Sequence, residues 1–251
     1  MPFVDPDTEI GGPRGRFPET RHSAILDLAA RDEAARSRAC DTLLTGYWKP
    51  VYKYIRLKWK KSNEDAKDLT QSFFARAFEK EFFSAYDPDR GSFRTYLRTC
   101  LDAFVANESK FANRRKRSAD APLLSLDFET AEGELREHQI PSGENLDDYF
   151  QREWVRNLFV LAVEALRQEC TSRDKLVQFQ LFERYVLETS GDQPTYDQLA
   201  SEFAISTTAV TNYLAAMRRK FRQVVLAALR EMTADDREFR NEARAVLGIE
   251  V

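Results

Sequence analysis

The sequence is poor in residues that turn a chain sharply or bind metals tightly. Its 251 residues include nine glycines, nine prolines, three cysteines and two histidines. So few glycines and prolines disfavour an all-β fold, which needs many turns. Cys40, Cys100 and Cys170 are odd in number and widely spaced. They therefore indicate buried thiols in a reducing cytoplasm, and neither a disulfide framework nor a zinc site.

Long apolar runs and catalytic motifs are missing as well. No stretch approaches the roughly 18–20 apolar residues of a membrane span, and residues 1–21 lack the apolar core of a signal peptide. We therefore expect a cytoplasmic protein without a membrane partner. The chain has no phosphate-binding glycine loop and no nucleophile elbow. The expectation is a binding protein rather than an enzyme, with no catalytic residue, cofactor or metal.

Charge is distributed unevenly along the chain. Residues 24–117 hold 20 Lys and Arg against 13 Asp and Glu, a net +7. Residues 118–150 hold one Arg against nine acids, a net −8, and residues 151–251 are nearly neutral. The basic block suits an anionic partner such as nucleic acid, so the segment charges say more about partners than the whole-chain pI.

Apolar residues recur at three- and four-residue steps, the period of amphipathic helices, and no strand alternation competes. The predicted fold is therefore all-α. Residues 1–19, rich in Pro and Gly, are predicted to be a disordered leader. Helical patterning predicts one domain over residues 20–117 and a second over residues 151–251. Residues 118–150 lose the periodicity, which predicts a long acidic linker between them.

The densest functional pattern lies between Thr195 and Arg222. Thr195 is expected to cap a short helix, and Ser206 or Thr207 to cap a second one after a tight turn. This layout is typical of a helix-turn-helix, whose second helix enters the major groove. Ala204 stands where this turn usually has Gly, so the backbone there must avoid a left-handed conformation or bear strain.

The second helix carries the side chains expected to face bases or phosphates. They are Ser206, Thr207, Thr208, Thr211, Asn212, Arg218, Arg219 and Arg222. Asn suits adenine and the Thr methyl group suits thymine. A plain helical hairpin with a polar face is the other interpretation.

A second nucleic-acid pattern combines aromatic residues and cations over residues 92–117. Rings stack on unpaired bases while cations meet phosphates. The candidate residues are Arg94, Tyr96, Asn107, Lys110, Asn113, Arg114, Arg115 and Arg117. The alternative interpretation is that the aromatic residues belong to the core and the cations form a solvated face. This alternative is favoured for Phe93 and Phe104.

The preceding predicted helix, capped at Ser62, carries Asp65, Asp68 and Gln71 at three-residue steps along one side. These residues suit a basic protein partner. Two carboxylates also resemble half of a metal or acid–base site, but no His or second carboxylate cluster accompanies them.

These segments, in this order, resemble a sigma factor of the extracytoplasmic-function (ECF) group, in the sigma-70 superfamily, from Phe17 onward. Asn63–Phe74 is similar to the family's helix that grips the β′ clamp helices of RNA polymerase, which implies that contact for Asp65, Asp68 and Gln71. Lys67 stands where the family usually has an acid.

The resemblance extends to the DNA-binding segments. Residues 93–97 resemble the promoter-melting stretch, with Tyr96 as its aromatic residue, and residues 104–117 resemble the reader of the −10 element. Residues 196–222 resemble the −35 reader. The first domain would then be sigma domain 2-like and the second sigma domain 4-like, ending in a C-terminal extension.

Implied partners are core RNA polymerase, through its β′ clamp helices and β flap, and promoter DNA. An anti-sigma factor and a regulatory kinase are further candidates. In this family the connector threads toward the polymerase active-site cleft, and its −8 charge suits that path. Phosphorylation of Thr70 would add about −1.5 to −2 charges to the clamp helix, although a plain surface hydroxyl is the simpler interpretation.

Three other functions remain open from the sequence. A stand-alone helix-turn-helix transcriptional regulator explains residues 195–222 but not the preceding segments. A metal-dependent nuclease would use Asp65 and Asp68. A helical adaptor would bind protein only.

Overall fold

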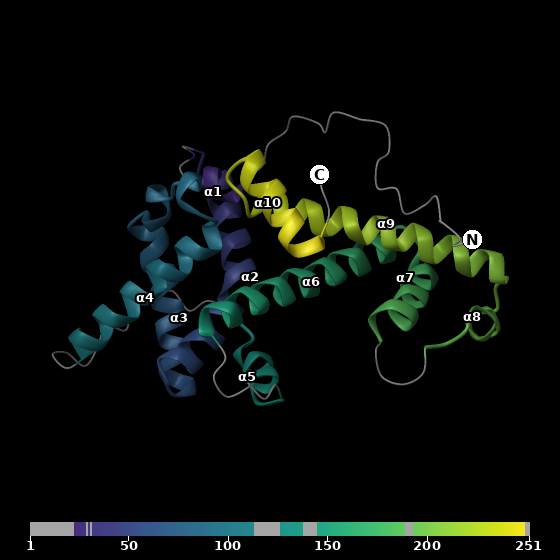
Figure 1. Ribbon diagram of the computed structural model, residues 1–251, viewed down its shortest axis with the longest axis horizontal. Helices are drawn as coiled ribbons and strands as arrows, with labels where there is room; N and C mark the ends of the chain where they lie inside the picture. The colour runs from purple at the N-terminus through teal and green to yellow at the C-terminus, as the bar shows by residue number, and fades with distance from the viewer. Residues whose placement is uncertain are drawn as a thin grey trace.

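The computed structural model describes residues 23–28, 30, 32–112, 126–137, 145–188 and 193–248. Throughout these ranges the regular elements are helices and no strand occurs, which confirms the all-α prediction (Figure 1). The predicted leader lies outside the described residues. The elements are α1 Ala24–Asp27, α2 Glu33–Lys58, α3 Asn63–Glu79, η2 Phe82–Ala85, η3 Pro88–Arg90, α4 Phe93–Ala112, α5 Phe128–Glu137, α6 Leu146–Ser172, α7 Leu176–Phe182, the π-turn η4 Glu183–Leu187, α8 Tyr196–Glu202, α9 Thr207–Glu231 and α10 Asp236–Leu247.

Side-chain caps begin the three helices that carry many of the candidate residues. Ser62 accepts a hydrogen bond from the backbone N–H of Asp65 at the start of α3. Thr195 and Gln198 form a capping box on α8, and Ser206 accepts from the N–H of Ala209 on α9. Each cap gives a partner to an N–H group that has none within its helix. The predicted caps at Ser62 and Thr195 are confirmed, and of the two candidates for the second helix the cap is Ser206.

One large apolar cluster joins the two predicted domains. In Figure 1, α6 runs along the molecule with one end against α2 and the other between α7 and α9. Its Trp154 is buried and stacks on Tyr47 of α2, with ring centroids 5.9 Å apart. The same apolar cluster includes Val225 and Leu229 of α9. Burial of these large side chains from both halves stabilises their relative placement.

The predicted acidic linker contains a packed helix. Helix α5 buries Phe128, whose ring lies 5.3 Å from Trp48 and 5.1 Å from Tyr52 of α2. Two hydrogen bonds from Arg56 hold Glu132 beside them. The loss of periodicity over residues 118–150 was therefore misleading for residues 128–137. A ten-residue helix that packs largely through acids paired with basic side chains gives little apolar pattern.

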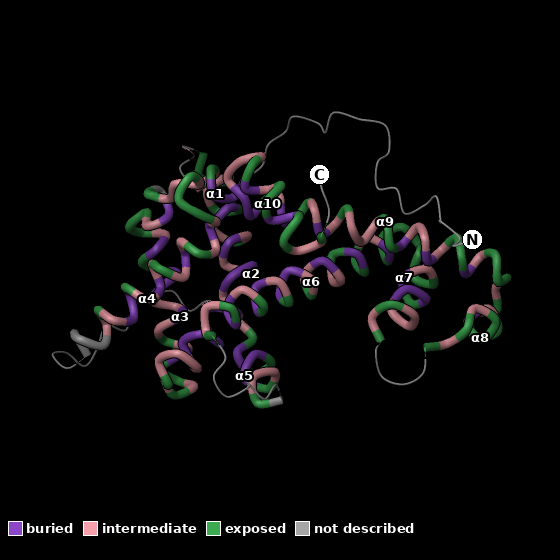
Figure 2. The backbone as a smooth tube through the Cα atoms, viewed as in Figure 1, coloured by how far each residue is buried: buried purple, intermediate pink, exposed green. Residues whose placement is uncertain are grey.

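The chain returns to its N-terminal half at its end. Helix α10 packs against α9 and lies beside the first helices, as Figure 1 shows. The hydroxyl of Ser23, before α1, donates a hydrogen bond of 2.7 Å to the carbonyl of Thr233. Figure 2 shows the buried residues gathered along the contacts of α2 and α6.

Two expectations from composition meet the structure here. Cys170 is buried, while Cys40 and Cys100 are half-buried, and all three thiols are free. The prediction of buried thiols is therefore right for Cys170 only. Within the described ranges, no helix combines the length and apolar character that crossing a membrane requires.

Candidate nucleic-acid interface

Helices α8 and α9 form the helix-turn-helix that the sequence predicts. Leu199 of α8 packs with Val210 and Leu214 of α9 and with Leu181 of α7 in a small apolar cluster. The turn between them places Ala204 at a φ of +52°. A left-handed conformation costs a non-glycine residue roughly 1–2 kcal/mol, so this turn bears the strain that the sequence allowed for.

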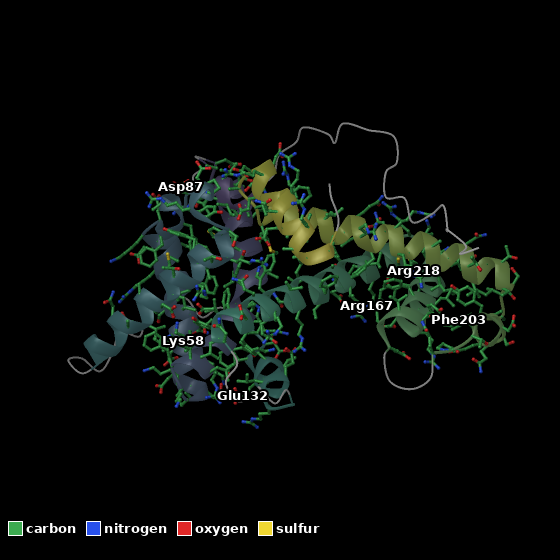
Figure 3. The ribbon with its side chains drawn as sticks, viewed as in Figure 1. Lys58, Asp87, Glu132, Arg167, Phe203 and Arg218 are labelled. Atoms are coloured by element: carbon green, nitrogen blue, oxygen red, sulfur yellow. The ribbon has the colours of Figure 1, made fainter. Side chains whose placement is uncertain are left out.

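The start of α9 presents polar side chains to solvent. Seven of the eight predicted base or phosphate contacts on α9 and its cap are exposed, and the eighth, Arg222, is half-buried. The seven are Ser206, Thr207, Thr208, Thr211, Asn212, Arg218 and Arg219. Figure 3 places Arg218 and the turn residue Phe203 at the end of the molecule remote from Lys58.

Local bonds already use part of this polar surface. The hydroxyl of Thr207 donates to the Asp197 carboxylate over 3.3 Å, and that of Thr211 donates to the carbonyl of Thr207 over 3.2 Å. No hydrogen bond to another described residue involves the side chains of Thr208 and Asn212. These two can therefore reach an outside hydrogen-bonding partner such as a base edge without breaking an internal bond.

The N-terminal end of α4 is covered rather than exposed. Arg94 is 14% exposed, lies 3.1 Å from the Glu242 carboxylate and sits 4.9 Å from the centre of the Trp154 ring. The DNA-binding role that the sequence suggests for Arg94 stays a prediction, and in the structure its guanidinium group is paired with a carboxylate of α10 that the sequence pattern does not reveal.

Tyr96 also has internal partners. Its hydroxyl donates 2.8 Å to the carbonyl of Phe82, and its ring lies 5.4 Å from that of Tyr86. Burial raises the pKa of Tyr96 to about 12. The ring is half-buried, so a base can stack only on its open part.

The other predicted residues of this segment divide into two groups. Asn107 is exposed on α4. Lys110 belongs to α4, but its side chain lies outside the described residues, as do all atoms of Asn113, Arg114, Arg115 and Arg117.

Helix α3 presents Asp65 and Asp68 to solvent, with Gln71 half-buried beside them. Lys67 forms an ion pair of 3.1 Å with Glu64, so these two side chains neutralise each other. The negative charge of this face is therefore concentrated on Asp65 and Asp68.

Thr70 does not belong to that surface. Its side chain is fully buried, and its hydroxyl donates 2.7 Å to the carbonyl of Ala66. The interpretation as a surface hydroxyl is wrong. Phosphorylation of the folded chain would require Thr70 to leave the core.

Comparison with protein-family models, with curated proteins and with solved structures finds no match for this chain.

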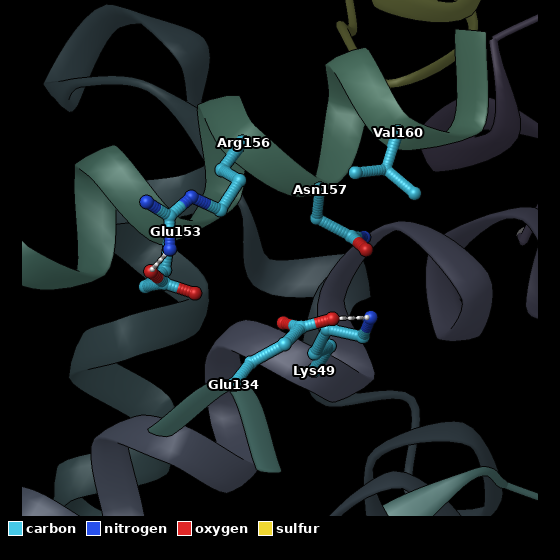
Figure 4. A pocket seen from close by; sticks show the side chains of 6 residues that line it. All are labelled: Lys49, Glu134, Glu153, Arg156, Asn157 and Val160. Atoms are coloured by element: carbon cyan, nitrogen blue, oxygen red, sulfur yellow. Dashed lines mark hydrogen bonds and ion pairs between the residues drawn. The ribbon is translucent and has the colours of Figure 1, made fainter. Parts of the chain in front are cut away.

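A network of buried charges near α5 was not found from the sequence. Lys53 of α2 is 1% exposed and lies 2.7 Å from Glu134 of α5 and 2.6 Å from Glu153 of α6. Figure 4 shows the adjoining pocket of about 290 Å³, where Lys49 pairs with Glu134 and Arg156 with Glu153. Each of these charged side chains forms an ion pair, and the pairs connect α2, α5 and α6. We therefore assign the network a structural role. Its only sequence signal is the complementary charge of the basic block and the acidic segment.

Among the described residues, no group of three His, Cys, Asp or Glu side chains could hold a metal ion.

Proposed function

We propose that this chain is a sigma factor of the extracytoplasmic-function type, which binds core RNA polymerase and directs initiation at specific promoters. The observation that carries the proposal is the helix-turn-helix and the two side chains at the start of α9. Thr208 and Asn212 are exposed there, and their side chains form no hydrogen bond with another described residue. An amide and a hydroxyl at that position suit base edges in the major groove, where each good contact contributes about 1–3 kcal/mol of discrimination.

Backbone contact would come from the cations further along α9. Arg218 and Arg219 are exposed on the same helix. Phosphate contacts fix the register of a protein on DNA, while base contacts select the sequence. No Lys or Arg lies over residues 207–217, the first three turns of α9, so free DNA binding should be weak and the polymerase should supply most of the nonspecific affinity.

The contact with polymerase is assigned to α3. Two carboxylates on an exposed helix face, neither in an ion pair with another described residue, suit a basic partner, because complementary charge speeds association and aligns the partners. The same face is less suited to DNA, whose phosphates would repel Asp65 and Asp68.

Core binding tests this assignment directly. Asp65→Asn/Asp68→Asn should weaken binding to core polymerase by about tenfold or more, because each partly desolvated charge contact contributes about 1 kcal/mol. Glu79→Gln is the matched control, since Glu79 is exposed at the other end of α3. Equal affinity of the wild type and the double variant would contradict the assignment.

A stand-alone regulator would behave differently in the same assay. It would bind a palindromic operator without core polymerase, since dimeric helix-turn-helix proteins read two half-sites about one turn apart. Binding of the pure chain to such an operator, with no affinity for core polymerase, would favour that function.

A further inference from the structure

Helix α10 closes the molecule onto the start of α4. One carboxylate oxygen of Glu238 accepts a hydrogen bond of 2.7 Å from the backbone N–H of Phe93, the first residue of α4. The other oxygen accepts 2.8 Å from the N–H of Ala234. The first N–H groups of a helix have no partner within it, and here a residue 145 positions away supplies one.

The next turn of α10 covers Arg94. Glu242 lies 3.1 Å from the guanidinium group, and its own side chain is only 7% exposed. At the other edge of this contact, Arg237 pairs with Asp89 of η3. The end of α4 that carries the proposed promoter-melting stretch is therefore occupied by carboxylates of the same chain.

This contact is more polar than the core around it. The buried residues of α10 are Glu238, Glu242 and Ala243. The Nε of Arg94 is buried without a hydrogen-bond partner in the described part of the chain, and the Glu242 oxygen that pairs with Arg94 makes only this ion pair, without hydrogen-bond geometry. When buried charges are incompletely hydrogen-bonded, the cost of removing them from water offsets much of the energy gained by pairing them. Such a contact opens at lower cost than an apolar core.

We propose that α10 is an autoinhibitory latch. It holds Glu238 against the N–H group of Phe93 and Glu242 against Arg94 until promoter DNA binds at the start of α4. The inference rests on the proposed function, because it takes Arg94 as a DNA contact. DNA phosphates compete with the Glu242 carboxylate for Arg94, and with the Glu238 carboxylate for the N–H group of Phe93, so closure weakens DNA binding by the free chain. Release of α10 on polymerase frees the end of α4.

The latch can be opened with a single substitution. Glu238→Ala removes the carboxylate that accepts from Phe93 and Ala234. Glu129→Ala is the matched control, because it removes the same charge from an exposed position on α5. Hydrogen exchange of residues 236–247 in the free full-length chain should rise about tenfold in Glu238→Ala and stay unchanged in the control. Unchanged protection of α2 and α6 against exchange shows that the Glu238→Ala variant remains folded. If that protection falls, the Glu242→Lys variant is used in its place.

DNA affinity then separates a latch from a merely structural helix. A fluorescent single-stranded oligonucleotide should bind Glu238→Ala about tenfold more tightly than Glu129→Ala, and adding Arg94→Ala should abolish the gain. Faster exchange of α10 with equal DNA affinity would overturn the inference.

The wild-type chain bound to core polymerase gives the last arm. Protection of α3 shows that the complex has formed, and residues 236–247 should then lose protection. If α3 is protected and α10 stays closed, the latch is wrong and the proposed function stands. If no complex forms, the proposed function fails and the oligonucleotide measurement alone decides the latch.

Discussion

The side-chain amide of Asn157 on α6 donates a hydrogen bond of 3.0 Å to the carbonyl of Gly46 on α2. That carbonyl lies four residues before Pro50, which has no N–H to donate and sits inside α2 rather than at its start. The same amide group also donates 3.1 Å to the carbonyl of Thr45. A neighbouring helix thus replaces the donor that the proline removes.

We expect Asn157→Leu to lower the free energy of unfolding by about 1–3 kcal/mol, because it leaves a buried carbonyl unsatisfied. In a Pro50→Ala background, the introduced alanine supplies its own N–H to the carbonyl of Gly46, so the same substitution should cost less. Urea unfolding of the four chains measures this coupling. Additive effects within about 0.3–0.5 kcal/mol would show that the two residues are independent.

The strained turn of the helix-turn-helix gives a prediction of opposite sign. Ala204→Gly should raise the free energy of unfolding by about 0.5–1 kcal/mol, because glycine adopts a positive φ without the clash of a Cβ atom. Ala209→Gly, the same change inside α9, should lower it by about 1 kcal/mol. Thermal unfolding of both variants checks the pair, and a destabilising Ala204→Gly would refute the assigned strain.

The ion pair between α5 and α2 predicts a pH dependence. Hydrogen bonds from Arg56 lower the pKa of Glu132 from 4.5 to about 2. The carboxylate therefore stabilises the fold fully above pH 4.5 and loses this contribution as the pH falls toward 2. The stability difference between wild type and Glu132→Gln should be largest near neutral pH and shrink over that window in urea titrations. A difference independent of pH would contradict the lowered pKa.

Burial of Thr70 predicts that a charged side chain cannot be accommodated there. Thr70→Glu should lower the melting temperature strongly, because an unpaired carboxylate would enter the core. Thr70→Val keeps the shape and loses one hydrogen bond, at a cost of about 1 kcal/mol. Mass spectrometry of kinase-treated native chain should find Thr70 unmodified. Modification of Thr70 with the fold intact would contradict its burial.

Local features were readable from the sequence where a few neighbouring residues decide the structure. The caps at Ser62 and Thr195 and the strained turn at Ala204 follow from such short-range chemistry.

Long-range pairing was not readable in the same way. Arg94 was expected to face DNA, yet its partner Glu242 lies on a helix far along the chain. The acidic segment was expected to be a linker between two domains, yet Glu132 pairs with Arg56 of α2. A charge run indicates that a complementary surface exists, but its position in the sequence does not tell whether that surface belongs to the same chain.

The central claim is tested most directly by transcription in vitro. Core polymerase alone, core with the wild-type chain, and core with Asp65→Asn/Asp68→Asn are compared on genomic fragments. We expect discrete start sites with the wild-type chain and none with core polymerase alone, and about tenfold less initiation at those sites with the double variant. A fourth sample with Asn212→Ala should show a changed promoter preference. A chain that binds core polymerase yet directs no specific initiation would contradict it.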